Sequence, residues 1–254
     1  MIGGGLLPHL GASIFYCHGI IYNTFSMING VAWSLEVEIQ FYLLMPAIAY
    51  FLFKIINLLV RHIVIFVLAL IFGILAESGV LKPWIINYTI VGYLHYFLIG
   101  ILLADARSVD SGVSDRRWDI VCAATVSCFF ASRALLPGEW YYAPIFGLAI
   151  FAALRGRWCL MALRSRWVCA LGGMCYTIYL YHAWILAFGA KALSRIYLNS
   201  QPLWVNCCIQ FPILAVATLA VCLPLYVYIE RPCMNRSWPA NVIGWLKGHY
   251  PKKC

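Results

Sequence analysis

The sequence has few acidic residues and no cysteine arrangement typical of a cross-linked or metal-binding protein. Only 9 of its 254 residues are Asp or Glu, and charged residues of both signs make up 11%, against roughly 25% in an average soluble domain. No Cys-x-x-Cys pair and no Cys/His ligand spacing occurs among the 11 cysteines. Most cysteines lie in or beside apolar runs, where cysteine packs as a small hydrophobic residue. We therefore expect no metal site and no disulfide framework.

The sequence also lacks the features of a nucleic-acid-binding protein or a nucleotide-binding loop. Its formal net charge is +9, but Lys and Arg lie in short loops between apolar runs. That distribution is typical of membrane topology and differs from a basic face that follows phosphates. No Gly-rich phosphate loop, zinc signature or Ser-x-x-Lys pattern is present. We expect the lipid bilayer, and no nucleic acid, as a partner.

Apolar stretches are what the sequence has in quantity, since 64% of its residues are hydrophobic. A membrane-spanning helix needs about 20 mostly apolar residues. The third and sixth of the segments below are shorter, so we expect their ends to extend into neighbouring polar positions. The segments are Leu6–Tyr22, Trp33–Phe53, Ile63–Ala76, Ile85–Ala104, Ile120–Leu136, Trp140–Leu154, Val168–Phe188 and Leu203–Ile229. They predict an all-α, polytopic integral membrane bundle of about eight transmembrane helices.

The basic residues predict how this bundle is oriented. If the chain starts inside, the loops facing outward contain few of the 18 Lys and Arg residues, namely Lys82, Arg133, Lys191 and Arg195. Cytoplasmic loops are enriched in Lys and Arg, so we expect both termini in the cytoplasm. No internal repeat or long linker divides the chain. We expect one transmembrane domain over residues 1–235 and a basic cytoplasmic tail over residues 236–254, in a multi-pass protein of the cell membrane (the inner membrane if the source is bacterial).

Two carboxylates open the second apolar segment. A charged group at the centre of a membrane helix costs about 2.5–3.5 kcal/mol on insertion scales, so such groups usually serve a site. Ser34 suits the N-cap, where its hydroxyl can accept from free backbone N–H groups. Glu36 then lies in the first turn, where an acid complements the helix dipole. This position is sufficient to explain Glu36.

Glu38 lies one turn deeper and needs another explanation. Ser34, Glu38 and Tyr42 are four residues apart in turn, so they share one helix face, with Phe41 adjacent. This spacing predicts a polar stripe that faces the interior of the bundle. Two interpretations stay open: Glu38 is a structural acid that joins helices through hydrogen bonds, or it belongs to a functional site.

Three further polar features lie in apolar surroundings. His95 and His182 are inside predicted helices, where a lone histidine is either an interhelical hydrogen-bond partner or a catalyst. Glu230 and Arg231 end the last segment with a pair of opposite charges that can anchor it at the inner face. Pro232 is expected to stop that helix, because proline cannot continue the backbone hydrogen bonding.

One motif in the second segment resembles a known family. Trp33-Ser34-Leu35-Glu36-Val37-Glu38, followed by Gln40-Phe41-Tyr42-Leu43 and by Pro46, resembles the most recognisable motif of the membrane acyltransferase 3 group of O-antigen and exopolysaccharide acetylases. Weaker elements of that family follow in the same order. They are Tyr96-Phe97-Leu98-Ile99-Gly100 through Ala104, Leu171-Gly172 through Tyr179-Leu180 and His182, and Glu230-Arg231-Pro232.

The resemblance implies an O-acyltransferase with no bound cofactor. Its donor would be cytoplasmic acyl-CoA, in particular acetyl-CoA, and its acceptor a hydroxyl of a sugar or a lipid-linked glycan. Glu38 would orient a neutral imidazole that acts as the base, with Ser34 and Trp33 in the same catalytic site. The resemblance assigns the remaining residues to two groups. Tyr42, Phe41, His182 and Tyr179 would bind substrate, and Glu230, Arg231 and Pro232 would be structural.

The family's first two helices, with an Arg and the histidine regarded as catalytic, have no counterpart in the sequence given. His9 and His18 precede the motif without the partner Arg at the family's spacing. We therefore expect a truncated acyltransferase 3 domain in which Glu38 is the orienting acid for a missing histidine, and which is an inactive fragment or remnant. The alternative is a membrane transporter or solute-binding protein without acyl transfer, in which Glu38 and His182 line a polar pathway.

Overall fold

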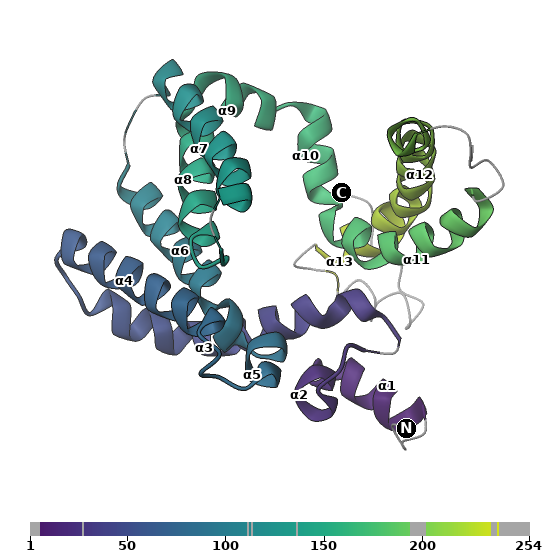
Figure 1. The fold of residues 1–254 in the computed structure, drawn as a ribbon, viewed down its shortest axis with the longest axis horizontal. Helices are drawn as coiled ribbons and strands as arrows, with labels where there is room; N and C mark the ends of the chain where they lie inside the picture. The colour runs from purple at the N-terminus through teal and green to yellow at the C-terminus, as the bar shows by residue number, and fades with distance from the viewer. Residues whose placement is uncertain are drawn as a thin grey trace. The chain divides into compact units, whose positions relative to one another are not determined.

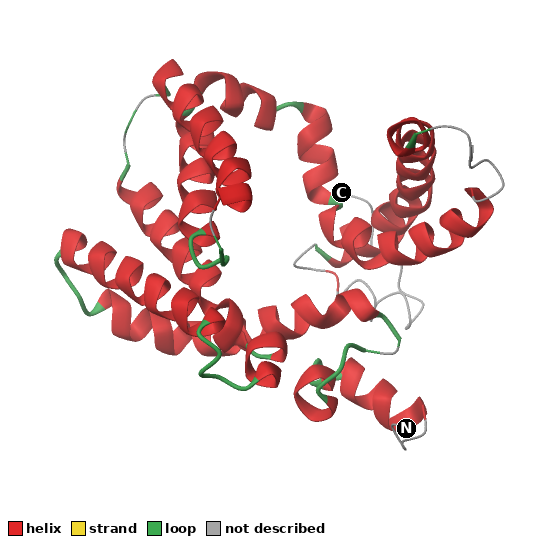
Figure 2. Ribbon diagram, viewed as in Figure 1, coloured by secondary structure: helices red, strands yellow, loops and turns green. Residues whose placement is uncertain are grey.

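The computed structural model describes residues 6–26, 28–110, 112, 114–135, 137–193, 202–234 and 238. Every regular element in those ranges is helical (Figures 1 and 2), which confirms the predicted all-α class. The chain divides into two compact units, residues 1–165 and 166–254. Each unit is described by itself below.

The first predicted span, Leu6–Tyr22, is wrong as a single transmembrane helix. It forms two short helices, α1 (Leu6–Ile14) and α2 (His18–Tyr22), separated by Tyr16 with a positive φ of 54°. The side chains of His9 and His18 meet at 2.9 Å between Nδ1 and Nε2. Nine residues of one continuous helix would separate them by about 13.5 Å along the axis, so this contact requires the chain to fold back.

The second segment begins one turn earlier than predicted. A 3₁₀ turn, η1 (Gly30–Ala32), leads into α3 (Trp33–Phe53). The side chain of Asn29 accepts from the Val31 N–H at 3.3 Å, so Asn29 caps this combined helix. The prediction that Ser34 is the N-cap is therefore wrong, since Ser34 lies inside α3. Glu36 lies in the first turn of α3, as predicted.

The third segment extends at both ends, as its short apolar run predicted. It forms α4 (Leu58–Glu77), whose N-cap Asn57 accepts from the Val60 N–H at 3.1 Å. The fourth segment is broken at Thr89, which has an extended backbone between α5 (Pro83–Tyr88) and α6 (Ile90–Val109). Helices α4 and α6 pack along each other (Figure 1).

Three further helices complete the first unit. They are α7 (Arg116–Leu135), α8 (Tyr142–Arg155) and α9 (Arg157–Leu163). Gly156 is extended between α8 and α9, which are bent by 88°. The buried core of this unit joins α3, α4, α6 and α8. It contains Leu52, Ile65, Ala69, Leu98, Ile99, Ile101 and Ala143.

The second unit contains α10 (Arg166–Gly173), α11 (Cys175–Leu193) and α12 (Leu203–Leu225), with α11 packed on α12. A π-helical turn, η3 (Tyr226–Glu230), and a final turn, α13 (Arg231–Cys233), extend α12. Pro232 therefore lies in the last turn, and the helix ends one residue beyond the predicted stop. The wider π turn precedes the proline, which has no N–H to bond to the preceding turn.

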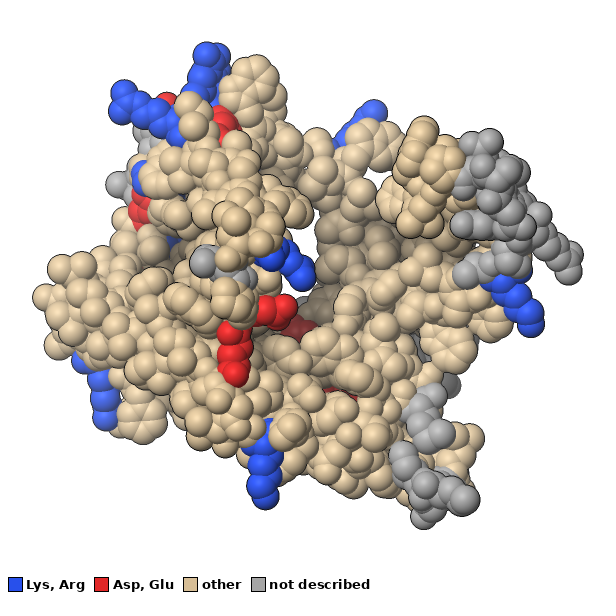
Figure 3. Space-filling model, in the orientation of Figure 1, with Lys and Arg blue, Asp and Glu red and all other residues tan. Residues whose placement is uncertain are grey.

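Five helices in the described ranges are long and apolar enough to cross a membrane, and the number is seven if each of two bent pairs is one span. The predicted number was about eight, and the count of seven differs from it by Leu6–Tyr22 alone. Large apolar side chains lie exposed on these helices, for example Leu43 at 76% and Phe211 at 74%. The face in Figure 3 has few charged side chains. Such surfaces suit lipid, and the protein is a multi-pass membrane protein.

The sides on which the termini lie, and the single transmembrane domain over residues 1–235, stay predictions. The basic tail predicted for residues 236–254 lies outside the described residues, apart from Trp238. The predicted sides of the loops after Phe53 can be kept without the first span only if the segment before Trp33 lies on the outer side, so they are then incompatible with a cytoplasmic N-terminus. We refer below to the end of the first unit that contains Trp33 as its outward end, following this prediction.

Candidate functional site

The aromatic residues of the Trp33–Glu38 motif and its extension attach α3 to α6. The Trp33 ring lies 5.2 Å from the Tyr93 ring, measured between centroids. Two turns further on, Phe41 stacks on Phe97 at 4.2 Å. These contacts fix one face of α3 and thereby the directions of Glu36 and Glu38.

Glu38 and Tyr42, which were predicted to share one helix face, are in contact, and the Tyr42 hydroxyl donates a short hydrogen bond to Glu38 Oε1. The four-residue spacing on one helix face explains it. Tyr42 is 58% exposed, and Glu38 is partly exposed. The polar stripe therefore lies at the surface of the described unit, and the prediction that it faces the interior is wrong there.

Glu36 is the buried acid of the motif, with 4% of its surface exposed. Its Oε2 accepts from the backbone N–H of Gly19, at the start of α2, at 2.8 Å. A first-turn position was sufficient to place Glu36 on α3, but its carboxylate also holds α2 against α3. Glu36 thus has the helix-joining role that the sequence analysis considered for Glu38.

Gln40, between the two aromatic anchors, joins α3 to the break at Thr89. Its Nε2 donates to the Tyr88 carbonyl at 3.2 Å, and its Oε1 accepts from the Ile90 N–H at 2.8 Å. Both backbone groups flank Thr89, where the helix is interrupted. One amide side chain therefore satisfies a donor and an acceptor that the break leaves free.

His9 and His18 form a buried relay beside this region, exposed by 2% and 0%. A carbonyl oxygen only accepts, so His18 Nδ1 donates to the Thr24 oxygen at 3.1 Å. In a neutral ring His18 Nε2 then accepts, and His9 Nδ1 is the donor at 2.9 Å. His9 Nε2 is left as a lone-pair nitrogen, and it has no hydrogen-bond partner among the described residues. Tyr22 packs on both imidazole rings.

A groove of about 570 Å³ runs along α3 and α6. Its walls extend from Phe41 to Phe53 on α3 and from Tyr96 to Ser108 on α6. Twelve residues of helix correspond to about 18 Å. The groove therefore begins at the tyrosine bonded to Glu38 and ends beside Asp105, towards the end of the unit predicted to face the cytoplasm.

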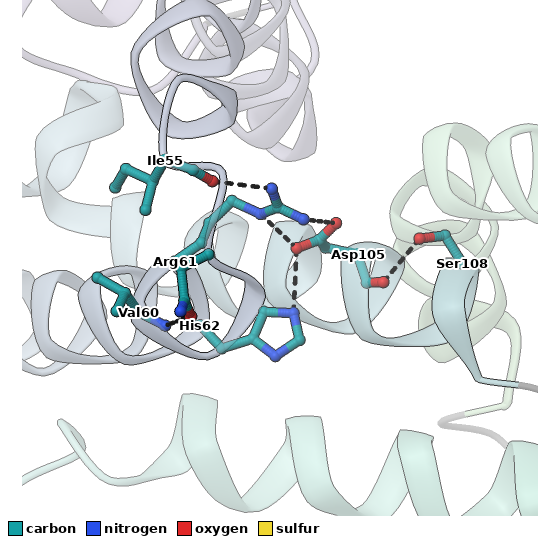
Figure 4. Close-up of polar contacts among 7 residues, drawn as sticks. Ile55, Val60, Arg61, His62, Asp105 and Ser108 are labelled. Carbon is teal, nitrogen blue, oxygen red and sulfur yellow. Dashed lines mark hydrogen bonds and ion pairs between the residues drawn. The ribbon is translucent and has the colours of Figure 1, made fainter.

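Asp105 is the centre of a polar cluster at that end (Figure 4). It is held by the Arg61 guanidinium in two parallel bonds, Nε to Oδ2 at 2.7 Å and Nη2 to Oδ1 at 2.9 Å. His62 Nε2 lies 3.0 Å from Oδ2, and the other ring nitrogen points away from the carboxylate (Figure 4). A forked Arg–carboxylate pair is strong and directional, so the cluster fixes α4 against α6.

Sequence reasoning missed both Asp105 and Gln40. The available signal for Asp105 was an acid directly after a long apolar run, with Arg61 directly before another. Gln40 was noted only as part of the motif. Nothing in the sequence indicated its role, because that role depends on the helix break at Thr89, 49 positions further along the chain. The cluster is buried, since only 6% of the Asp105 side chain is exposed.

The remaining predicted substrate residues lie in the second unit. His182 Nδ1 donates to the Tyr179 carbonyl, 2.6 Å away on the same helix. The prediction that His182 bonds between helices is therefore not met in the described part. A neutral ring with Nδ1–H engaged leaves Nε2 as the acceptor, so His182 retains a nitrogen suited to bind a donor.

Glu230 was expected to pair with Arg231 but is bonded to a different residue, Thr177. It accepts from the Thr177 backbone N–H at 3.2 Å and from the Thr177 hydroxyl. Thr177 lies on α11 and Glu230 ends the π turn after α12, so the contact joins the two helices. The described ion pairs do not include Glu230 with Arg231.

The described ranges contain no group of three His, Cys, Asp or Glu side chains that could hold a metal ion. What they contain is a carboxylate–phenol pair, a two-histidine relay and an apolar groove between polar ends. Such an arrangement suits proton transfer and binding of an extended, largely apolar chain.

Comparison with known proteins relates the chain that carries these features to one family. A family model described as an acyltransferase domain matches residues 2–227, which covers both units. A search of curated proteins and a search of solved structures each found no similar protein.

Proposed function

Since this chain belongs to the membrane acyltransferase 3 family, we propose that it moves an acyl group, acetyl in the first instance, from acyl-CoA to a hydroxyl of a sugar or lipid-linked glycan. It does so in the cell membrane, with donor and acceptor as its partners besides the bilayer. The observation that carries the proposal is the groove between α3 and α6, which joins Tyr42 to the surroundings of Asp105.

The groove suits the donor for two reasons. Its lining is mainly apolar, and it runs for about 18 Å along two helices, which fits the extended thioester arm of CoA. Its Asp105 end lies near Arg61, Arg107 and Arg155, at the end where basic residues are common. Phosphate groups outside the membrane would be attracted there, while the thioester reaches towards Tyr42 and Glu38.

His9 is the base that we assign within this chain. Its Nε2 takes the proton of the acceptor hydroxyl as that oxygen attacks the thioester carbon. A carbon–oxygen bond forms, the carbon–sulfur bond breaks, and CoA leaves as a thiolate that is then protonated. His18 and the Thr24 carbonyl hold His9 in one tautomer, the positioning role that a carboxylate has in a Ser-His-Asp triad.

By the resemblance, Glu38 would stabilise the positive charge that the catalytic imidazole acquires, and Tyr42 holds the Glu38 carboxylate in place. The relay is connected to α3 through a neighbouring residue, since His18 precedes Gly19, whose backbone N–H is bonded to Glu36. Trp33, Ser34 and Phe41 shape the same end of α3. The resemblance gives Tyr179 and His182, which lie in the second unit, a role in substrate binding.

The test uses the full protein in vesicles with acyl-CoA that carries a labelled acyl group. Label moved to a glycan hydroxyl supports the proposal, and the His9→Gln variant should lose about 10²–10⁴-fold of the rate. Gln keeps a side-chain N–H for His18, so an unchanged unfolding temperature shows that α1 and α2 still pack. Solute flux that needs no acyl-CoA, without transfer of label, would instead favour a transporter.

A further inference from the structure

A separate polar cavity of about 230 Å³ lies at the outward end of the first unit. Its walls come from the end of α4, from α5, from the start of α6 and from the loop before α8. The polar and aromatic residues that line it are Glu77, Asn87, Tyr93, His95, Tyr96 and Glu139. Trp33 touches Tyr93, so the cavity is next to the motif on α3, and Tyr96 is the one lining residue that it shares with the α3–α6 groove.

His95 gives the first indication of a ligand. Its side chain lines the cavity, is 6% exposed, and its Nδ1 has no hydrogen-bond partner among the described residues. Its ring contacts Tyr96 at 4.2 Å between centroids. Buried ring nitrogens are nearly always paired with protein or with a bound molecule. An unpaired one in the wall of a cavity therefore indicates an occupant that supplies the partner.

The charges on the cavity wall indicate what kind of occupant. Glu77 and Glu139 both line it, and the lining contains no Lys or Arg. Neither acid takes part in the ion pairs found in the described ranges. The Glu139 backbone N–H donates to Glu77 Oε1, which holds the two acids at one rim. Two carboxylates repel an anion, so phosphate groups and CoA itself are unsuited to this cavity.

The size of the cavity and the groups that line it indicate a small organic group. The described residues form no cluster of three His, Cys, Asp or Glu that could hold a metal ion. A cavity of about 230 Å³ is also smaller than the roughly 300–1,000 Å³ of sites for drug-sized molecules. It therefore suits an organic group of one ring or less. The faces of Tyr93 and Tyr96 add to the attraction for a cation.

We propose that this cavity binds the ammonium group of a small organic amine. A primary ammonium has three N–H donors, and the wall offers acceptors on three residues, namely the carboxylates of Glu77 and Glu139 and the ring nitrogen of His95. The proposal does not depend on acyl transfer, because it concerns binding alone, through Glu77, Glu139 and His95, to which the transfer assigns no role.

The test compares two probes of nearly equal size, glucosamine and glucose, by calorimetric titration of the full protein in neutral detergent at mildly acidic pH. The probes differ by an ammonium in place of a hydroxyl. We expect glucosamine to bind at least about tenfold more tightly, because charge-assisted hydrogen bonds are the stronger ones. Equal affinities, or no binding of glucosamine, would overturn the proposal.

Variants locate the site. Glu77→Gln keeps an acceptor oxygen for the Glu139 N–H, so it removes the charge with little effect on the fold. We expect Glu77→Gln and Glu139→Gln each to weaken glucosamine at least about tenfold, with glucose unaffected. Asp115→Asn is the matched control, since Asp115 is a half-exposed acid elsewhere in the unit. An equal loss in this control would show a general charge effect and overturn the assignment.

A final arm identifies the source of the amine. The protein is placed in vesicles with either ethanolamine or choline headgroups, and glucosamine is titrated again. If ethanolamine vesicles weaken glucosamine binding and choline vesicles do not, the cavity binds a lipid headgroup, since a choline headgroup has no N–H to donate. Undiminished glucosamine binding in both vesicles assigns it to a water-soluble amine.

Discussion

Gly19 donates its backbone N–H to the Glu36 carboxylate at 2.8 Å, which attaches the short helix α2 to the first turn of α3. The contact is crowded as well as polar. A Cβ on Gly19 would lie 2.9 Å from Tyr88 Cδ1, 3.1 Å from Tyr88 Cβ and 3.2 Å from Glu36 Oε2. Three helices, α2, α3 and α5, therefore meet at a position where only glycine fits.

Gly19→Ala should destabilise the protein by about 1–3 kcal/mol, the usual cost of overpacking. Gly11→Ala is the matched control, because a Cβ there meets nothing within 4 Å. In a helix that control should be neutral or stabilise by about 0.5–1 kcal/mol. Thermal unfolding in detergent measures both changes. Equal stability of the two variants would contradict the crowded contact.

Gln40→Leu should leave two backbone groups without a partner, the Tyr88 carbonyl and the Ile90 N–H. Each unsatisfied buried group costs about 1–3 kcal/mol. Gln40→Glu keeps an acceptor for Ile90 but removes the donor to Tyr88, so we expect an intermediate loss. Unfolding temperatures should rank wild type, Gln40→Glu and Gln40→Leu in that order, and a different order would argue against the bridge.

Arg61→Met should be strongly destabilising, by about 3–5 kcal/mol, because it leaves the Asp105 carboxylate buried without its main partner. The two side chains are only 13% and 6% exposed. Asp105→Leu combined with Arg61→Met removes both charges and should recover part of the loss. A double-mutant cycle from unfolding free energies tests the pair. Additive effects would mean that the two residues do not interact.

Asp110 should make the stability of the fold depend on pH in the acid range. The Gly112 N–H, with the guanidinium groups of Arg155 and Arg107, holds the pKa of the Asp110 carboxyl below its ordinary value. A lowered folded-state pKa contributes stability that is present above the unfolded pKa of about 3.9 and is lost as the pH falls through the folded value. Unfolding temperature against pH should fall less steeply for Asp110→Asn in that acid range, and a parallel curve would contradict this.

The sequence predicted the fold class and the membrane location well, because apolar runs and loop charges are local signals. It was less successful with Leu6–Tyr22, since a run of that composition suits either one helix or two. The contact between the His9 and His18 side chains shows that this run forms two short helices. No pattern along the chain reports that the two side chains meet.

The two motif acids show the same limit. Spacing alone predicted that Glu38 and Tyr42 share a face, because both residues lie within one helix. The buried state of Glu36 depends on Gly19, which belongs to another segment. Position in the first turn therefore explained Glu36 correctly but incompletely, and the roles of Gln40 and Asp105 needed tertiary structure.

The most direct measurement is the rate of acyl transfer from labelled acyl-CoA by the Glu38→Gln variant of the full protein in vesicles. Gln keeps an acceptor for the Tyr42 hydroxyl, so the amount of folded protein in the membrane and its unfolding temperature should match wild type. We predict that the rate falls by at least about a hundredfold, the lower range for removal of a group that acts on proton transfer. Turnover close to that of wild type would contradict the central role of Glu38.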